Sequence, residues 1–347
     1  MGSPTLFGPL VTRMLHKGVR TTTAMKRVAR TLFVVSVIGA GSFPLSARAQ
    51  QVQDAEVEVL QVRPNFYMIA GAGGNIAVQI GEDGIVLVDT GSASMSERVS
   101  AAIRKLAATG VTYIIDSSDD TDHVGGNAAI PHAVNPAGWP ETVIVATQSA
   151  QDRLAASQRG NSASATETMY LQDEKPLYLN GEGIQVLAQR AAHTDGDAMV
   201  FFRRSDVLVA GDVLDTTRFP VIDLKRGGSI HGEIEALNRI ITLAIPSIPF
   251  VFQPGGTLVI PGHGYICERD DVVRYRNMIT IIRDVVQDMI KRGMSLEQVK
   301  AADPTKGYRA RFGSDTGAWT TDRFVEAVYR SLRNHPEYAA LAADVGK

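Results

Sequence analysis

The alternation of short apolar runs with amphipathic segments is the feature that most constrains how this chain folds. Short runs rich in Ile, Val, Leu and Phe, bounded by Gly, Asp or other polar residues, predict β-strands. Apolar residues spaced three and four apart predict helices between those runs. Interleaving of this kind favours a layered α/β domain with helices on the outer faces of the sheets. The strands are expected at 66–69, 76–80, 85–88, 113–115, 143–146, 184–187, 199–202, 207–210 and 258–260, and the helices at 94–107 and 233–245.

The pattern becomes helical beyond Pro261. Residues 271–292 carry apolar side chains along one face, and Ser295 to Gln298 has the residues of a capping box at a helix start. A last helix is expected from about 321 to 333. Because no flexible linker precedes this region, residues 266–347 are predicted to form a helical C-terminal extension packed on an α/β domain of residues 50–265.

Residues 1–49 have the pattern of a leader. They hold seven Lys or Arg and no acidic residue. Met25 is the expected start, and a basic segment, an apolar run over 32–43 and a small-x-small site ending at Ala49 follow it, as in a secretory signal peptide. The apolar run falls short of the roughly 20 residues that span a bilayer, so no stable membrane anchor is expected. Cleavage near Ala49 predicts a periplasmic or secreted protein.

Composition excludes several function classes. The single cysteine, Cys267, cannot form an internal disulfide or a Cys-based metal centre, and its place just after a predicted strand favours burial. Residues 50–347 hold 28 basic against 37 acidic residues, which argues against nucleic acid as a partner. A small-molecule substrate is expected, and the sequence leaves the oligomeric state open.

Polar side chains gather where the predicted strands end. Since the ends of parallel strands meet at one edge of a sheet, residues distant in sequence can converge there. Imidazole and carboxylate are the usual ligands of zinc and other divalent first-row metals. These residues are Ser118, Asp120, Asp122 and His123 after 113–115, His193 before 199–202, Asp212 after 207–210, and His263 after 258–260.

Five segments in order resemble the metallo-β-lactamase superfamily. They are VLVDTG (86–91), DSSDDTDHVGGN (116–127), HTDGD (193–197), VAGD (209–212) and PGHG (261–264). The resemblance covers about residues 56–265. It implies an αββα sandwich whose active site lies in the groove between two sheets and holds one or two divalent metal ions. The helical tail is similar to extensions carried by some exported members.

The chain departs from the family pattern in one motif. The family usually has T-H-x-H-x-D-H there, and this chain has Ser118 and Asp120 in place of the first two histidines. The resemblance implies a first site built from the positions of Ser118, Asp120 and His193. It implies a second site built from Asp122, His123 and His263, with Asp212 bridging the two. The second site is therefore complete and the first is impaired.

The resulting hypothesis is an exported metal-dependent hydrolase. A metal-activated water would attack an ester, thioester, lactone or amide bond, including that of a β-lactam. Asp122 is the candidate that orients or deprotonates the water, and Asp197 is a candidate partner of a ligand. Zinc is the expected ion, with Mn or Fe as alternatives because oxygen-rich sites favour harder ions. The alternative hypothesis is a degenerate, non-catalytic member that binds a ligand or a partner.

Three local interpretations accompany this hypothesis. Asp120 is either a ligand or a solvated loop charge. The GAGGN segment (71–75) is predicted to be a hairpin turn, because it lacks the Lys-Ser/Thr and the helix of a phosphate-binding loop. The polar stretch 155–168 is predicted to be a mobile loop, either a surface excursion or a lid.

Overall fold

The computed structural model describes residues 56–157, 167–169, 173–247 and 255–334. The predicted leader and its cleavage site lie outside these residues. Among the helices that are described, none combines the length and apolar character needed to cross a bilayer.

One sheet of the described chain has seven strands that follow the order of the sequence. The strands up to β4 pair antiparallel with their neighbours, and β4, β5, β6 and β7 run parallel to one another. The bounds are β1 (Glu58–Arg63), β2 (Phe66–Ala70), β3 (Ile76–Gly81), β4 (Gly84–Val88), β5 (Val111–Ile115), β6 (Val143–Thr147) and β7 (Glu167–Met169).

The other described sheet has six strands in the order β13-β12-β11-β10-β9-β8. Pairing is antiparallel except between β11 and β12, which are parallel. The bounds are β8 (Glu174–Leu179), β9 (Glu182–Gln189), β10 (Asp197–Phe202), β11 (Val207–Asp215), β12 (Leu258–His263) and β13 (Cys267–Glu268).

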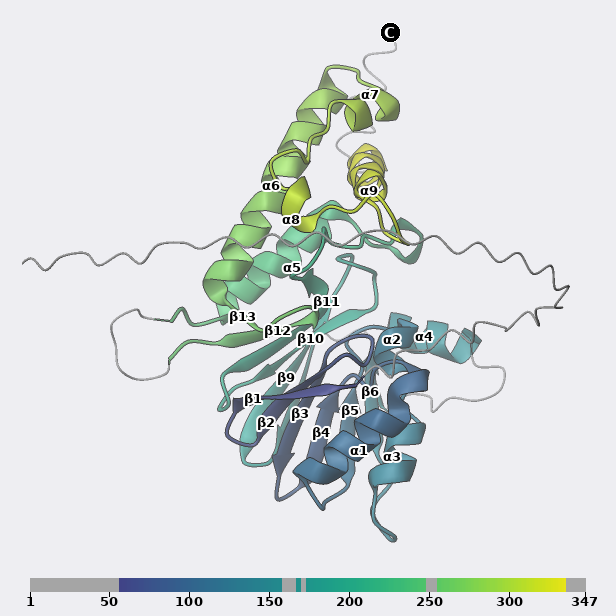
Figure 1. Cartoon of the computed structure of the whole chain (residues 1–347), viewed down its shortest axis with the longest axis vertical. Coiled ribbons are helices and arrows are strands. Elements are labelled where there is room, and N and C mark those ends of the chain that lie inside the picture. Colours follow the sequence, from purple (N-terminus) through teal and green to yellow (C-terminus); the bar gives the residue numbers. More distant parts are fainter. Residues whose placement is uncertain (1–55, 158–166, 170–172, 248–254, 335–347) are drawn as a thin grey trace, which may run out of the picture. The chain divides into compact units, whose positions relative to one another are not determined.

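Helices cover the outer faces of both sheets (Figure 1). The first sheet is covered by α1 and α3, and the second by α5, with α6 and α9 packed onto α5. The described helices are η1 (Ala93–Met95), α1 (Ser96–Leu106), α2 (Thr121–Val124), α3 (Ala129–Val134), α4 (Gln148–Ser157), η2 (Leu224–Arg226), α5 (Ile230–Leu243), α6 (Arg269–Lys291), α7 (Leu296–Ala301), α8 (Arg309–Phe312) and α9 (Thr321–Asn334).

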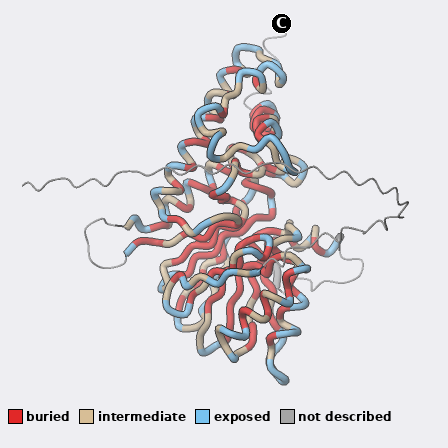
Figure 2. Tube along the Cα trace, viewed as in Figure 1, coloured by how far each residue is buried: buried red, intermediate tan, exposed pale blue. Residues whose placement is uncertain are grey.

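Side-chain alternation along the strands builds the layers. In β10, Met199 and Phe201 point into the core under the helices, whereas Val200 and Phe202 point into the core between the sheets. Phe202 meets Phe66 of β2 edge to face, with ring centroids 4.8 Å apart. Figure 2 shows the strands buried along much of their length, as expected when both faces of a sheet are covered. The αββα fold predicted from the sequence is confirmed.

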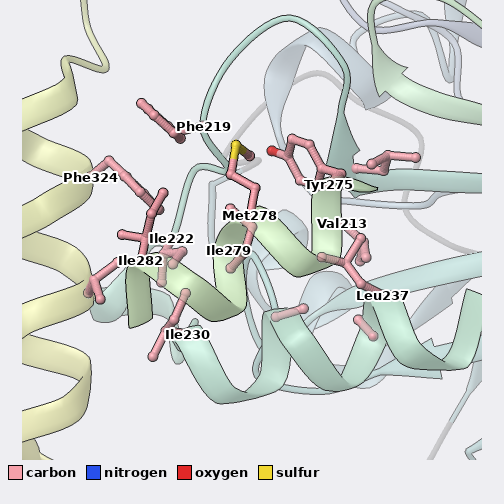
Figure 3. Packing of buried hydrophobic residues seen from close by; sticks show 14 of the residues in the cluster. Val213, Phe219, Ile222, Ile230, Leu237, Tyr275, Met278, Ile279, Ile282 and Phe324 are labelled. Atoms are coloured by element: carbon pink, nitrogen blue, oxygen red, sulfur yellow. The ribbon is translucent and has the colours of Figure 1, made fainter. Parts of the chain in front are cut away.

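The C-terminal helices share a hydrophobic core with the second sheet (Figure 3). Ile279 and Ile282 of α6 and Phe324 of α9 pack into the cluster that also contains strand and α5 residues. Phe324 stacks on Phe219, with ring centroids 4.7 Å apart. The capping box predicted at Ser295 is present at the start of α7. Cys267 is buried in this core, as its sequence position indicated.

The strand predictions hold for all of the strongly apolar runs, whereas β1, β7, β8 and β13 were not predicted. Strand β8 lies at a sheet edge and alternates exposed with half-buried residues, so it lacks an apolar run. The loop prediction for 155–168 was wrong at both ends: residues 155–157 belong to α4, and Glu167 and Thr168 belong to β7. The rest of that stretch lies outside the described residues.

Candidate metal centre

The candidate site lies where strands of both sheets end. Asp89 follows β4, the segment from Asp116 to His123 follows β5, and His263 ends β12. Asp212 sits within β11 beside β12, in a region where the pairing register shifts. We call this edge of the two sheets the rim. The convergence of strand ends predicted from the sequence is what brings these residues together.

The residues of the second site meet around a common point. Nε2 of His263 lies 3.4 Å from Oδ2 of Asp122 and 3.4 Å from Oδ1 of Asp212. Nε2 of His123 lies 3.1 Å from the same Asp212 oxygen. Ligand atoms about 2.1 Å from one tetrahedral ion lie roughly 3.4 Å apart, so these spacings fit a divalent first-row ion. Asp122, His123 and His263 form one of the groups in the described chain that could hold a metal.

His123 is oriented by a buried carboxylate behind it. Nδ1 of His123 lies 2.8 Å from Oδ2 of Asp89, and Ser117 donates to Asp89 from its backbone N–H (2.8 Å) and its hydroxyl (2.6 Å). A carboxylate on the far nitrogen of a ligating histidine fixes the tautomer that leaves Nε2 free for a metal. Burial lowers the pKa of His123, but the negative charges of Asp212 and Asp89 outweigh it and raise the pKa well above its usual value.

The GAGGN segment closes the back of the second site. It joins antiparallel strands β2 and β3, which confirms the hairpin interpretation. A Cβ on Gly74 would lie only 2.6 Å from the His123 ring, so the backbone approaches that ring more closely than any side chain allows. The N–H of Gly74 donates to the carbonyl of Asp122 at 2.9 Å, which ties the segment to the ligand loop.

The first site contains Asp120, His193 and Asp212, which form the other metal-capable group in the described chain. Nε2 of His193 lies 2.9 Å from Oδ2 of Asp120 and 3.7 Å from Oδ2 of Asp212. Nδ1 of His193 donates to the carbonyl of Val221 at 2.7 Å. Burial lowers the pKa of His193, but the hydrogen bond to Asp120 and the charges of Asp212 and Asp197 raise it to about 10. Ser118 is fully buried and its hydroxyl accepts from the N–H of Asp120 at 3.2 Å, a loop contact.

A guanidinium is also present at the first site, and no sequence pattern indicated it. Arg226 is the last residue of η2 and donates two hydrogen bonds to Asp120. Its Nη1 donates to Oδ1, and its Nη2 donates to Oδ2 at 3.1 Å. Burial by itself raises the pKa of Asp120, but the hydrogen bonds from His193 and Arg226 hold it well below its usual range. Asp120 is therefore not a solvated loop charge: its side chain is 27% exposed and it accepts from two cationic groups.

Asp212 connects the two sites. Its Oδ1 faces His123 and His263, and its Oδ2 faces His193. Burial raises the pKa of Asp212, but the neighbouring histidines, His123 first, bring it well below its usual value. Asp197 accepts from the N–H and the hydroxyl of Thr194 and so holds the 193–197 turn, and it acts on His193 through its charge. Burial raises the pKa of Asp197 to about 7.

A cavity of about 230 Å³ opens onto the rim. Asp120, Asp122, His193, Asp212 and His263 line one side of it. Its other lining residues include Arg218, whose Nε donates a hydrogen bond to Asp215. Ala318 and Trp319, just before α9, also line it. These five candidate ligands therefore share one cavity with a cationic side chain and an aromatic one, whereas His123 does not line it. A larger cavity of about 360 Å³, beside Tyr265 and Phe312, includes none of the ligands.

Comparison with known families agrees with this geometry. A family model described as the metallo-beta-lactamase superfamily matches residues 70–267, which is more than half of the chain. The chain belongs to the metallo-beta-lactamase superfamily. The matched region contains Asp89, every candidate ligand and Arg226. Among curated proteins, none matches the chain significantly.

Solved structures share the superfamily fold at low sequence identity. The stereoselective inverting sec-alkylsulfatase Pisa1 from Pseudomonas sp. is similar with a TM-score of 0.58 and 13% identity over 83% of this chain and 52% of that one. The chain thus spans about half the length of that relative. A metallo-beta-lactamase from Pontibacter korlensis is similar with a TM-score of 0.51 and 15% identity over 65% of this chain and 99% of that one. Together with the ligand groups, the superfamily supports a metal-dependent hydrolase in general.

Proposed function

We propose that the protein is an exported hydrolase that uses a divalent ion held at the second site to cleave an ester, thioester, lactone or amide bond. The observation that carries this proposal is the convergence of His123, His263 and Asp212 within 3.1–3.4 Å, with Asp122 against His263. Two imidazoles and two carboxylates are a donor set suited to zinc, and Mn or Fe are alternatives.

Each residue has a distinct task in this proposal. A divalent ion held by these residues would lower the pKa of a bound water from about 15.7 to about 7 and would polarise the bond under attack. Asp89 keeps Nε2 of His123 directed into the site. Asp122 approaches His263 through Oδ2, which leaves its second oxygen to accept a proton from the attacking water. The side chain of Asp122 is 40% exposed and faces the cavity, so it is placed to exchange that proton with solvent.

A sulfate ester is a second candidate substrate, and Arg218 favours it. This guanidinium lines the cavity while Asp215 holds it in place, so an anionic group of a substrate would find a positioned cation there. Pisa1, which this chain resembles in fold, is a sec-alkylsulfatase. Arg218→Gln is expected to raise KM for anionic substrates about tenfold and to leave KM for a neutral ester unchanged.

The test combines metal content with a substrate panel. The full chain would be assayed with ester, lactone, thioester, cephalosporin and sec-alkyl sulfate substrates, before and after chelation and on return of Zn, Mn or Fe. Asp122→Ala and His263→Ala are expected to lose both bound metal and activity. Asp284→Ala and His132→Ala, which change exposed residues outside the site, are matched controls expected to keep both. Metal retention without hydrolysis of any substrate would favour the non-catalytic alternative, and wild-type protein without metal would refute the proposal.

Export is part of the proposal and has its own test. The basic, apolar and small-x-small pattern of residues 25–49 supports cleavage near Ala49. A C-terminally tagged chain is expected in the periplasm or the medium with a mature N-terminus near Gln50. Recovery in the cytoplasm with an uncleaved N-terminus would contradict it.

A further inference from the structure

The hydrogen bonds of Asp120 compete with a metal ion at the first site. Nη1 of Arg226 donates to Oδ1, and Oδ2 accepts from Nη2 of Arg226 at 3.1 Å and lies 2.9 Å from Nε2 of His193. A carboxylate oxygen has two lone-pair directions, so both directions at Oδ2 are in use. An ion bound there would have to displace one of these donors.

Arg226 is fixed in place by more than Asp120. Nε of Arg226 donates to Asp223 at 2.8 Å, and Nη1 lies 3.5 Å from Asp119. Asp223 caps η2 by accepting from the N–H of Arg226, and the Arg226 carbonyl accepts from the N–H of Asp195 at 2.8 Å. The guanidinium is therefore anchored at both its side chain and its backbone, which makes its displacement by an ion costly.

A second guanidinium extends the same network. Arg153 of α4 donates to both oxygens of Asp119, at 2.7 and 2.9 Å, and to Asp195 at 2.5 Å. Asp119, the neighbour of Asp120, is thus paired with two arginines, and both carboxylates have their countercharge within the protein. Arginine suits this task because its planar fork binds carboxylates with two parallel hydrogen bonds.

The second site differs in its charge. In the described part of the chain, no Lys or Arg donates a hydrogen bond to Asp122, Asp212, His123 or His263. Arg218, which lines the same cavity, pairs with Asp215. The carboxylates of the second site therefore face histidines directly, and the charge of Arg218 reaches Asp212 and Asp122 only through space.

We propose that the rim holds one divalent ion, at the second site, and that Arg226 supplies at the first site the positive charge that a first ion would bring. This inference rests on the metal site of the proposed function and assigns its stoichiometry. Arg226 does not line the cavity, so it acts through Asp120 and His193 as a positioning residue.

Direct metal binding tests the stoichiometry without any activity assay. Metal-free full-length protein would be titrated with Zn²⁺ or Co²⁺ by calorimetry, and the bound metal counted by plasma mass spectrometry after desalting. Wild type is expected to bind one equivalent. Asp120→Asn is expected to keep that equivalent with its Kd within twofold, whereas Asp122→Asn is expected to weaken it at least tenfold.

Removal of the guanidinium gives the complementary result. Arg226→Ala is expected to gain a second equivalent at least tenfold weaker than the first, because Asp120, His193 and Asp212 then lack their cation. Lys225→Ala removes an exposed charge from the same turn and is expected to stay at one equivalent. Thermal unfolding identifies an Arg226→Ala protein that fails to fold, in which case the wild-type count and Asp120→Asn decide.

The outcomes separate this inference from the proposed function. Two tight equivalents in wild type, or tenfold weaker binding in Asp120→Asn, would overturn the single-ion assignment and leave the metallo-hydrolase standing. A folded Arg226→Ala protein that stays at one equivalent would also overturn the role of Arg226. No bound metal in wild type would overturn both.

Discussion

Replacing Asp89 with Asn tests how the second site is oriented. The wild-type carboxylate accepts from the N–H of Ser117 through Oδ1, and its Oδ2 receives the Ser117 hydroxyl and Nδ1 of His123. An Asn side chain offers one acceptor and one donor. If its NH₂ group faces His123, Nδ1 must become the acceptor, and the ring proton moves to Nε2. If its NH₂ group faces the Ser117 N–H, two donors oppose each other in a buried position.

The expected loss follows from this geometry. An ion on Nε2 keeps the ring proton on Nδ1, where it would oppose the Asn NH₂ group instead of meeting a carboxylate. The alternative rotamer leaves a buried donor unsatisfied at about 1–3 kcal/mol. Changes to the partner of a ligating histidine typically reduce metal affinity by about 10–100-fold. At about 1.4 kcal/mol per tenfold, Asp89→Asn should weaken binding by about 1.4–2.8 kcal/mol.

The assay is a competition titration of metal-free protein with Zn²⁺ and a chromophoric chelator at neutral pH. Asp284→Asn is the matched control, because it makes the same chemical change on the exposed side of α6. Near-wild-type thermal unfolding in the presence of a chelator would show that the variant is folded. If a folded Asp89→Asn protein bound Zn²⁺ within twofold of wild type, either His123 would not be a ligand or Asp89 would not set its tautomer.

Three further predictions concern neighbouring features. Gly74→Ala places a Cβ 2.6 Å from the His123 ring, so it should weaken Zn²⁺ binding at least tenfold and lower the free energy of unfolding by about 1–3 kcal/mol. Gly307→Ala is the control, because its added Cβ meets open space, and it should change neither quantity. Equal effects of the two substitutions would contradict the reasoning. The pKa of His193 is raised to about 10, so its ion pair stabilises the metal-free fold fully below about pH 6.5, and this stabilisation is lost as the pH rises through 10. The free energy of unfolding of wild type minus that of His193→Gln should therefore fall between about pH 6.5 and 10. A constant difference would be evidence against this ion pair. Burial raises the pKa of the Cys267 thiol to about 12, so Ellman's reagent at pH 8 should label it only after unfolding, and rapid labelling of folded protein would show the thiol to be accessible.

The sequence predicted the fold because its strands and helices depend on local pattern. Fully buried strands such as β10 are continuous apolar runs, which stand out against polar flanks. Strand-end topology placed Asp122, His123, Asp212 and His263 at one edge of the sheets, and the resemblance to the metallo-β-lactamase superfamily grouped them into a second site. The edge strand β8 was missed, because alternate residues along it are exposed and it therefore has no apolar run.

The countercharge of the first site could not be predicted in the same way. Arg226 lies in a short turn more than a hundred residues after Asp120, and nothing in the letters DLKRGG distinguishes it from other surface arginines. Its role follows from the folded path of the chain, where the turn after Asp223 returns to the rim. Asp89 was part of a recognised motif, but its task as the partner of His123 needed the distance between them.

The position of Trp319 has a consequence for how proteins of this kind diversify. The ligands come from strand ends between residues 120 and 263, whereas Ala318 and Trp319, which wall the same cavity, belong to the C-terminal helical region. Part of the cavity wall is thus encoded in a stretch of polypeptide separate from the candidate ligands. Substitutions in the C-terminal helical region can therefore reshape part of the cavity wall while the candidate ligands stay unchanged.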